Sequence, residues 1–151
     1  MRHQASVEID RPIDEVFQLT NDHVAEWSTV VVEEEVIGKK PEGVGTTFRT
    51  VTEDHGRRME FDGVVTQYDP PRASAVRLTG DTFDIVAEYT FDDLDGRTRV
   101  TQQSSVNGKG LFKVFLVLCG WMMKKSSCRA LEKELLGLKA FCEGQADSAA
   151  G

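Results

Sequence analysis

Hydrophobic and polar residues alternate along much of the first 106 positions, and a period of two is typical of half-buried β-strands. The clearest example is residues 82–92, whose predicted inward positions are Phe83, Ile85, Ala87, Tyr89 and Phe91. Turn signals containing Gly, Pro or Asp separate the alternating runs, so we expect an antiparallel meander. The predicted strands span residues 4–9, 30–37, 45–54, 57–68, 72–79, 82–92 and 97–106.

Two short helices are expected between the first and second strands. Asp10 or Arg11 lies in the cap region of the first helix. Pro12 suits its first turn, because the N–H group that proline lacks has no helical partner there. Apolar residues at helical spacing follow, and Asn21 ends the pattern. Residues 22–28 predict a second short helix or turn.

Residues 110–143 predict one long C-terminal helix, and its first half is apolar almost all round. A helix that covers one sheet needs only one apolar stripe, with polar residues on its other face. Residues 111–123 exceed that requirement. We therefore expect a bound apolar ligand, a second subunit or a membrane surface to cover them. The run is too short to span a bilayer.

These elements predict an α+β fold, in which a curved antiparallel sheet of about seven strands wraps on the long C-terminal helix. A chain of 151 residues is most simply one domain. We place that domain at residues 1–143. Residues 144–151 are small and polar, and are expected to form a flexible tail.

Five short motifs occur in order along this pattern. They are a strand–Pro–helix opening at 9–17, Trp27, a Gly-x-Gly-Thr strand entry at 43–46, a Pro-Pro-Arg turn at 70–72 and a Gly-x-Thr-x-Val hairpin at 96–100. Together they resemble the helix-grip fold of the START and polyketide cyclase/dehydrase superfamily, often called SRPBCC, over residues 6–141. The resemblance implies an apolar molecule held between the curved sheet and the long helix. Carriers, receptors, cyclases and hydrolases share this fold, so it fixes the architecture better than the activity.

A cavity of that kind would be lined by inward side chains from both layers. The candidates from the strands are Phe48, Phe61, Ile85, Tyr89, Val100, Gln102 and Ser104. The candidates from the helices are Trp27, Phe112, Phe115, Leu116, Cys119 and Met123. The alternative for each apolar residue is a place in a packed core. Gln102 and Ser104 are more informative, because buried polar groups need a partner such as a ligand or an ordered water.

Catalytic residues are not identified by the sequence. His3 lies near the start of the chain, His55 lies in a turn, and His23 opens the second short helix near the expected cavity mouth. We find no nucleophile elbow and no metal-ligand spacing, and we expect no metal or cofactor. Tyr89 is either a hydrogen-bond donor or a core aromatic residue with its hydroxyl at the rim. Residues 33–35, three consecutive glutamates, are expected on an exposed strand edge.

The charge distribution excludes one class of partner. The net charge is −7, and residues 108–143 hold seven Lys/Arg against three Glu, which leaves −7 − 4 = −11 on the rest of the chain. An acidic body argues against nucleic-acid binding, which needs a basic face. Three cysteines on one predicted helix argue against a disulfide framework. Together with a start that has no apolar signal region, they predict a cytoplasmic location.

Three functions remain open from the sequence. The leading hypothesis is a binding or carrier domain for a small hydrophobic molecule, such as a lipid, a polyketide or an isoprenoid. The second is a cyclase or dehydratase, with Tyr89, Gln102 or His23 handling protons. The third is an interaction module whose apolar helix face packs on a partner protein or forms a homodimer.

Overall fold

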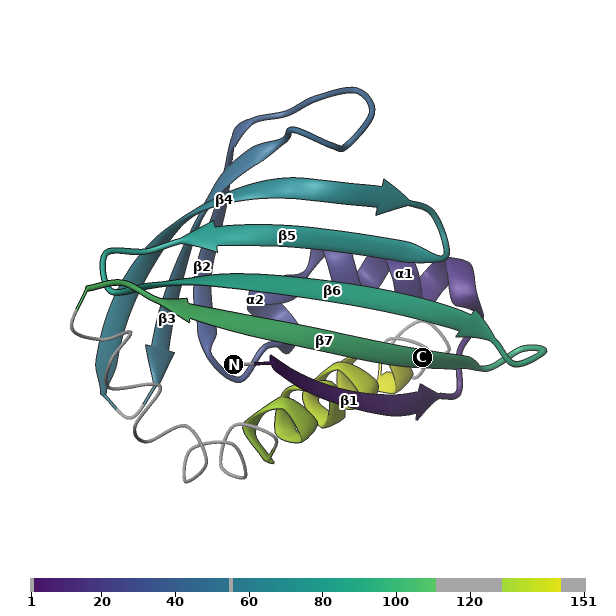
Figure 1. The fold of residues 1–151 in the computed structure, drawn as a ribbon. Coiled ribbons are helices and arrows are strands. Elements are labelled where there is room, and N and C mark those ends of the chain that lie inside the picture. The colour runs from purple at the N-terminus through teal and green to yellow at the C-terminus, as the bar shows by residue number, and fades with distance from the viewer. Residues whose placement is uncertain (1, 55, 111–128, 145–151) are drawn as a thin grey trace.

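Seven antiparallel strands form one strongly curved sheet, in the order β1-β7-β6-β5-β4-β3-β2 (Figure 1). The computed structural model describes residues 2–54, 56–110 and 129–144. The sheet confirms the predicted meander. The first strand, β1, forms one edge of the sheet by pairing with β7, the last strand in the sequence. The strands are β1 (Arg2–Ile9), β2 (Val31–Gly38), β3 (Thr47–Asp54), β4 (Arg57–Asp69), β5 (Ala73–Thr79), β6 (Phe83–Asp93) and β7 (Thr98–Gly108).

The turn between β6 and β7 shows how the local sequence sets the meander. Asp95 and Gly96 both adopt positive φ, at 64° and 96°. Gly tolerates this conformation without steric cost, and Asp is among the residues that tolerate it best. The Oδ1 atom of Asp93 accepts a hydrogen bond of 2.9 Å from the backbone N–H of Asp95. The turn therefore forms where the sequence predicts a hairpin.

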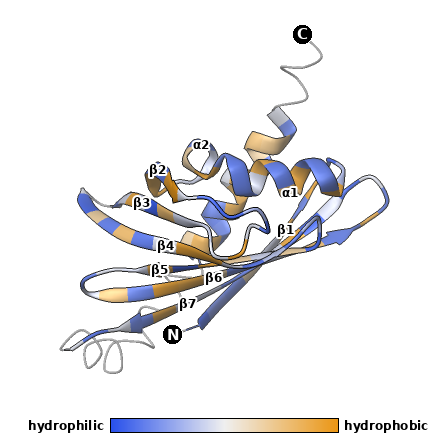
Figure 2. Ribbon diagram, turned by 90° about the horizontal axis from the view of Figure 1, so that it is seen from above, coloured by the Kyte–Doolittle hydropathy of each residue, from blue (hydrophilic) through white to orange (hydrophobic). Residues whose placement is uncertain are grey.

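Both predicted short helices are present, as α1 (Ile13–Asp22) and α2 (Val24–Trp27). Pro12 occupies the N-cap position of α1, one residue before the first turn in which the sequence placed it. Figure 2 shows α1, α2 and the C-terminal helix on the same side of the sheet. The helices that the structure describes therefore cover the concave face of the sheet.

The described part of the C-terminal helix, residues 129–144, buries one stripe of side chains. Leu131, Leu135, Leu138 and Cys142 follow the helical period on that stripe. The last three pack into a core with side chains from the sheet, α1 and α2, namely Ile9, Val16, Phe17, Trp27, Phe91 and Val100. The predicted apolar segment 111–123 lies outside the described residues, as does the predicted tail beyond residue 144.

Hydrogen bonds fix the helix to the rest of the chain at both ends. Near its start, the Glu134 carboxylate accepts a 2.7 Å bond from Ser28 Oγ and further bonds from the backbone N–H and hydroxyl of Thr29. Near its end, Glu143 Oε2 accepts a 2.9 Å bond from the backbone N–H of Asp10. Between them, Gly137 lets the helix approach closely, because a Cβ atom there would lie 2.8 Å from the carbonyl oxygen of Trp27.

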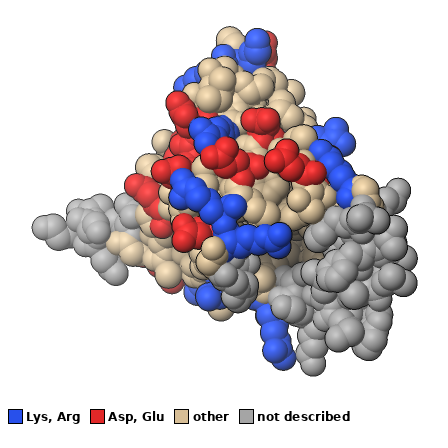
Figure 3. Space-filling view, turned by 90° about the vertical axis from the view of Figure 1, so that its left-hand side faces the viewer, with Lys and Arg blue, Asp and Glu red and all other residues tan. Residues whose placement is uncertain are grey.

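The outer surface carries interleaved charges. The guanidinium of Arg58 lies 3.1 Å from the carboxylate of Glu33, and Arg49 pairs with Glu60. Figure 3 shows acidic and basic side chains side by side on the face that it presents. Exposed pairs of this kind contribute only about 0–1 kcal/mol each, so they keep the face hydrated rather than hold the fold together.

Candidate ligand-binding cavity

A cavity of about 1090 Å³ lies between the concave face of the sheet and the helices. Its described walls come from all seven strands, from α1 and α2, and from the start of the helix at 129–144. Binding sites for small molecules typically measure about 300–1,000 Å³, so this space is large enough for a ligand of several rings or a long chain. The packed core occupies the other end of the same interface, where Leu135 and Leu138 meet Val100.

Most of the described candidate residues lie on this cavity. The walls include Trp27, Phe48, Ile85, Tyr89, Gln102 and Ser104. Phe61 and Val100 do not line it. Phe61 is 3% exposed and packs its ring against Phe83, with centroids 5.6 Å apart, and Val100 is fully buried in the core. The candidates from the final helix lie outside the described residues, namely Phe112, Phe115, Leu116, Cys119 and Met123.

A row of polar side chains crosses four strands on the cavity wall. The strand register places Tyr68, Ser74, Tyr89 and Gln102 opposite one another on β4, β5, β6 and β7. Directly opposite residues share a face of the sheet, with Cβ atoms roughly 5 Å apart. The sequence identified Tyr89 and Gln102 but missed Ser74, because the alternation in β5 left its register ambiguous.

Two members of this row lack a hydrogen-bond partner. Ser74 is 3% exposed and Gln102 is 7% exposed, and within the described part of the chain nothing bonds to Ser74 Oγ or Gln102 Oε1. A buried polar atom without a partner costs about 1–3 kcal/mol. A ligand or an ordered water in the cavity would remove that cost, as the sequence predicts for Gln102.

Tyr89 is held in its neutral form. Burial raises the pKa of its hydroxyl above its usual range, and the nearby carboxylates of Glu134 and Glu34 raise it further. Both effects disfavour the phenolate, since one removes water and the other adds like charge. At neutral pH the Tyr89 hydroxyl is therefore available to donate a hydrogen bond into the cavity.

Glu34 faces the cavity, which the sequence did not predict. The run 33–35 is exposed on an edge strand of the sheet, as the sequence predicts. However, the pairing with β3 shifts between Val31 and Glu33, so that Glu34 lies opposite Thr50 on the inner face. An irregularity of one residue moves every following side chain to the other face of a strand. Strict alternation starting from Val31 would instead place the Glu34 side chain on the outer face of the sheet.

The carboxyl group of Glu34 is partly desolvated. Burial raises the pKa of Glu34 to about 7, and the hydroxyl of Thr50 partly opposes this rise. The residue keeps exposed surface because the cavity opens beside the edge strand. A carboxyl group with this pKa is about half ionised at neutral pH, so Glu34 can either accept or supply a proton there.

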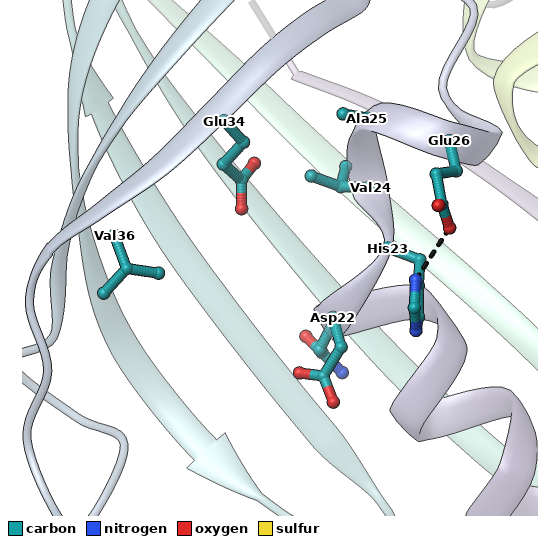
Figure 4. A pocket seen from close by; sticks show the side chains of 8 residues that line it. Asp22, His23, Val24, Ala25, Glu26, Glu34 and Val36 are labelled. Carbon is teal, nitrogen blue, oxygen red and sulfur yellow. Dashed lines mark hydrogen bonds and ion pairs between the residues drawn. The ribbon is translucent and has the colours of Figure 1, made fainter.

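A smaller pocket of about 360 Å³ adjoins the cavity between α1, α2 and β2 (Figure 4). Glu34 projects from β2 toward Val24 and lines both spaces. His23 lines only the smaller pocket, and its Nδ1 atom lies 2.7 Å from Glu26 Oε2. The structure therefore places His23 at the entrance and pairs it with an acid that the sequence did not suggest.

Of the two histidines that the structure describes, His3 lines the large cavity. It is 6% exposed, lies on β1 opposite Ser104, and lines the wall. Its proximity to the chain start suggested fraying. Yet His3 continues the alternation of Ala5, Val7 and Ile9 on the inner face, and that signal could have located it. His55 lies outside the described residues.

The described residues contain neither a metal site nor a membrane-spanning helix. Within residues 2–54, 56–110 and 129–144, no group of three or more His, Cys, Asp and Glu side chains is arranged to hold a metal ion. No helix in the same ranges is long and apolar enough to cross a membrane. The predicted homodimer depends on residues 111–123 and stays a prediction.

A curved antiparallel sheet that closes over a C-terminal helix, with a large cavity between them, defines the helix-grip architecture of the START/SRPBCC superfamily. The family described as "Polyketide cyclase / dehydrase and lipid transport" matches residues 2–143. The chain belongs to this family, as its sequence motifs predict. None of the curated proteins matches it in sequence.

Solved structures share the whole architecture. A protein of Thermus thermophilus aligns with a TM-score of 0.79 at 19% identity, over 96% of this chain and 99% of its own. A START superfamily protein from Mycobacterium smegmatis gives 0.76 at 19% identity, over 95% and 98%. The Zhui aromatase/cyclase from Streptomyces sp. R1128 gives 0.76 at 16% identity, over 100% and 98%. At these identities the similarity establishes the fold alone.

Proposed function

We propose that this protein binds a small hydrophobic molecule, such as a lipid, a polyketide or an isoprenoid, in the cavity between its sheet and its C-terminal helix. The observation that carries the proposal is the size of the cavity, about 1090 Å³, together with the apolar side chains on its walls. These include Phe48, Val65, Val76, Leu78 and Ile85. Each Å² of apolar ligand surface moved out of water there stabilises the complex by about 25 cal/mol.

The first test is to identify what the purified protein carries. Native mass spectrometry would reveal a stoichiometric adduct, and solvent extraction would release it for identification. The same spectrum gives the oligomeric state, which separates a ligand-binding monomer from a protein that uses its apolar helix as an interface. If the purified protein carries no adduct, direct binding measurements decide the proposal.

A matched pair of variants tests the location of binding. Ala87 lines the cavity on β6, whereas its neighbour Val86 is not among the cavity-lining residues. Ala87→Phe is expected to fill part of the cavity and weaken binding of the neutral dye Nile red, and Val86→Phe should leave binding nearly unchanged. Circular dichroism and urea unfolding establish that both variants fold. Equal binding by the wild type and Ala87→Phe would exclude this cavity as the binding site.

A cyclase or dehydratase activity is the second candidate, favoured by the polar row on the wall. The neutral Tyr89 hydroxyl lies opposite both Ser74 and Gln102, so a bound carbonyl compound would meet several polar groups together. One protein of similar fold is an aromatase/cyclase. An enzyme of this kind would lose turnover of its substrate in Tyr89→Phe while keeping its binding affinity. Unchanged turnover in Tyr89→Phe and Gln102→Ala would remove the row from the chemistry.

A further inference from the structure

Glu34 is the acidic side chain that projects from the sheet into the cavity mouth. It lines both the large cavity and the smaller adjoining pocket, and Figure 4 shows its carboxylate between β2 and α2. The backbone irregularity before Glu34 fixes this direction, because it brings the residue into register with Thr50 on the inner face. A ligand that fills the cavity toward its mouth therefore meets a carboxylate.

Several other charged or titratable groups line the same two spaces. They are His3 on β1, Asp22 on α1, His23 and Glu26 at α2, Lys39 and Lys40 after β2, Tyr89 on β6, and Glu134 on the final helix. Glu134 already accepts bonds from Ser28 and Thr29, and His23 is paired with Glu26. Lys39 and Lys40 are exposed to solvent.

The position at the cavity mouth also changes the acidity of Glu34, whose pKa is raised to about 7. Burial is the main cause, the Thr50 hydroxyl is the opposing one, and no cation among the described residues lowers it. Glu34 keeps exposed surface, so its ionised carboxylate is only partly desolvated, and a paired cation would still stabilise it. The described surroundings leave that pairing to a ligand or to solvent.

A second, independent observation points to a polar group on the ligand at this wall. Thr52 lies two residues beyond Thr50 on the same face of β3 and is 8% exposed. Its Oγ1 atom has no hydrogen-bond partner within the part of the chain that the structure describes. A purely hydrocarbon ligand would leave this hydroxyl without a partner and would offer the Glu34 carboxylate no charged one.

We propose that the cavity selects apolar molecules that carry a cationic amine at the end beside Glu34. It disfavours molecules that carry a free carboxylate at that end. This inference rests on the proposed function. An ammonium group supplies both a positive charge and several N–H donors, and such charge-assisted bonds are about twice as strong as neutral ones. A ligand carboxylate would instead place a second negative charge beside Glu34, and two carboxylates in one site oppose each other's ionisation.

Three probes with the same decyl chain test the selection: decylamine, decanol and decanoate, each used to displace Nile red near pH 8. For the wild type, decylamine is expected to displace the dye at about one-tenth of the decanoate concentration. Decanol should fall between them. Glu34→Gln should bring the three probes close together, and Glu34→Lys should reverse the order in favour of decanoate.

Glu35→Gln is the matched control, because it removes a neighbouring carboxylate from the same strand that does not line the cavity. This variant should keep the wild-type order of probes. In the wild type the preference for decylamine should grow between about pH 5.5 and about pH 8.5, since Glu34 ionises in that interval while the amine stays charged.

The outcomes separate this inference from the proposed function. If Nile red does not bind the wild type at all, the proposed function fails and the selection fails with it. If Nile red binds but the three probes displace it equally, or if Glu34→Gln keeps the wild-type order, the selection fails and the cavity remains a binding site. A preference abolished by Glu35→Gln as fully as by Glu34→Gln would also overturn it.

Discussion

Replacing Gly137 with alanine tests how closely the C-terminal helix lies on the rest of the protein. A Cβ atom at this position would lie 2.8 Å from the backbone carbonyl oxygen of Trp27 and 3.6 Å from Thr29 Cγ2. A separation of 2.8 Å is far inside van der Waals contact. The obstructing atom belongs to the backbone, so it cannot rotate away, and either the helix or the end of α2 must shift.

Two opposing free energies decide the result. Alanine is favoured over glycine inside a helix by about 1 kcal/mol, which would stabilise the variant. Forcing an extra methyl group into a packed interface costs about 1–3 kcal/mol. Gly137→Ala is therefore expected to lower the free energy of unfolding by up to about 2 kcal/mol, because the clash exceeds the gain in helix propensity.

Urea unfolding followed by circular dichroism measures this change as a shift in midpoint at constant slope. Gly144→Ala is the matched control in the same helix, since no heavy atom of the described residues lies within 4 Å of its Cβ position. The control should be no less stable than the wild type. A Gly137→Ala protein that is more stable than the wild type by about 1 kcal/mol would show helix propensity alone and refute the close approach.

Three further predictions concern Leu138, Cys142 and Glu34. Leu138→Ala, at a fully buried position, should cost about 2–5 kcal/mol of unfolding free energy, against under about 0.5 kcal/mol for Leu136→Ala, which is 58% exposed; equal losses in urea unfolding would contradict this. Burial raises the pKa of the Cys142 thiol to about 12, so with the other two cysteines changed to serine it should resist iodoacetamide near pH 8, and rapid alkylation of native protein by mass spectrometry would oppose its burial. The pKa of Glu34 is raised from 4.5 to about 7, so its contribution to stability is present below about pH 4.5 and is lost as the pH rises through about 7. Glu34→Gln should therefore gain stability relative to the wild type as the pH rises through that window, and equal urea midpoint differences at its two ends would contradict this.

The sequence by itself determined the order of the strands and helices and which face of most strands points inward. Period-two alternation located the seven strands, because the face of each side chain in a strand depends only on its neighbours along the chain. Turn residues such as Asp95 and Gly96 located the connections, because they tolerate a backbone conformation that other residues avoid. The sequence also predicted a C-terminal helix, and the structure describes residues 129–144 as helical.

Only the tertiary structure decided which side chains the cavity contains. One irregularity in the pairing of β2 turns Glu34 inward, and the register across β5, β6 and β7 places Ser74 and Gln102 on either side of Tyr89. Phe61 has the alternation of a cavity residue but packs against Phe83 instead. Alternation is a local property of the chain, whereas register and packing depth depend on contacts between residues far apart in sequence, and these contacts form only when the whole sheet closes over the helices.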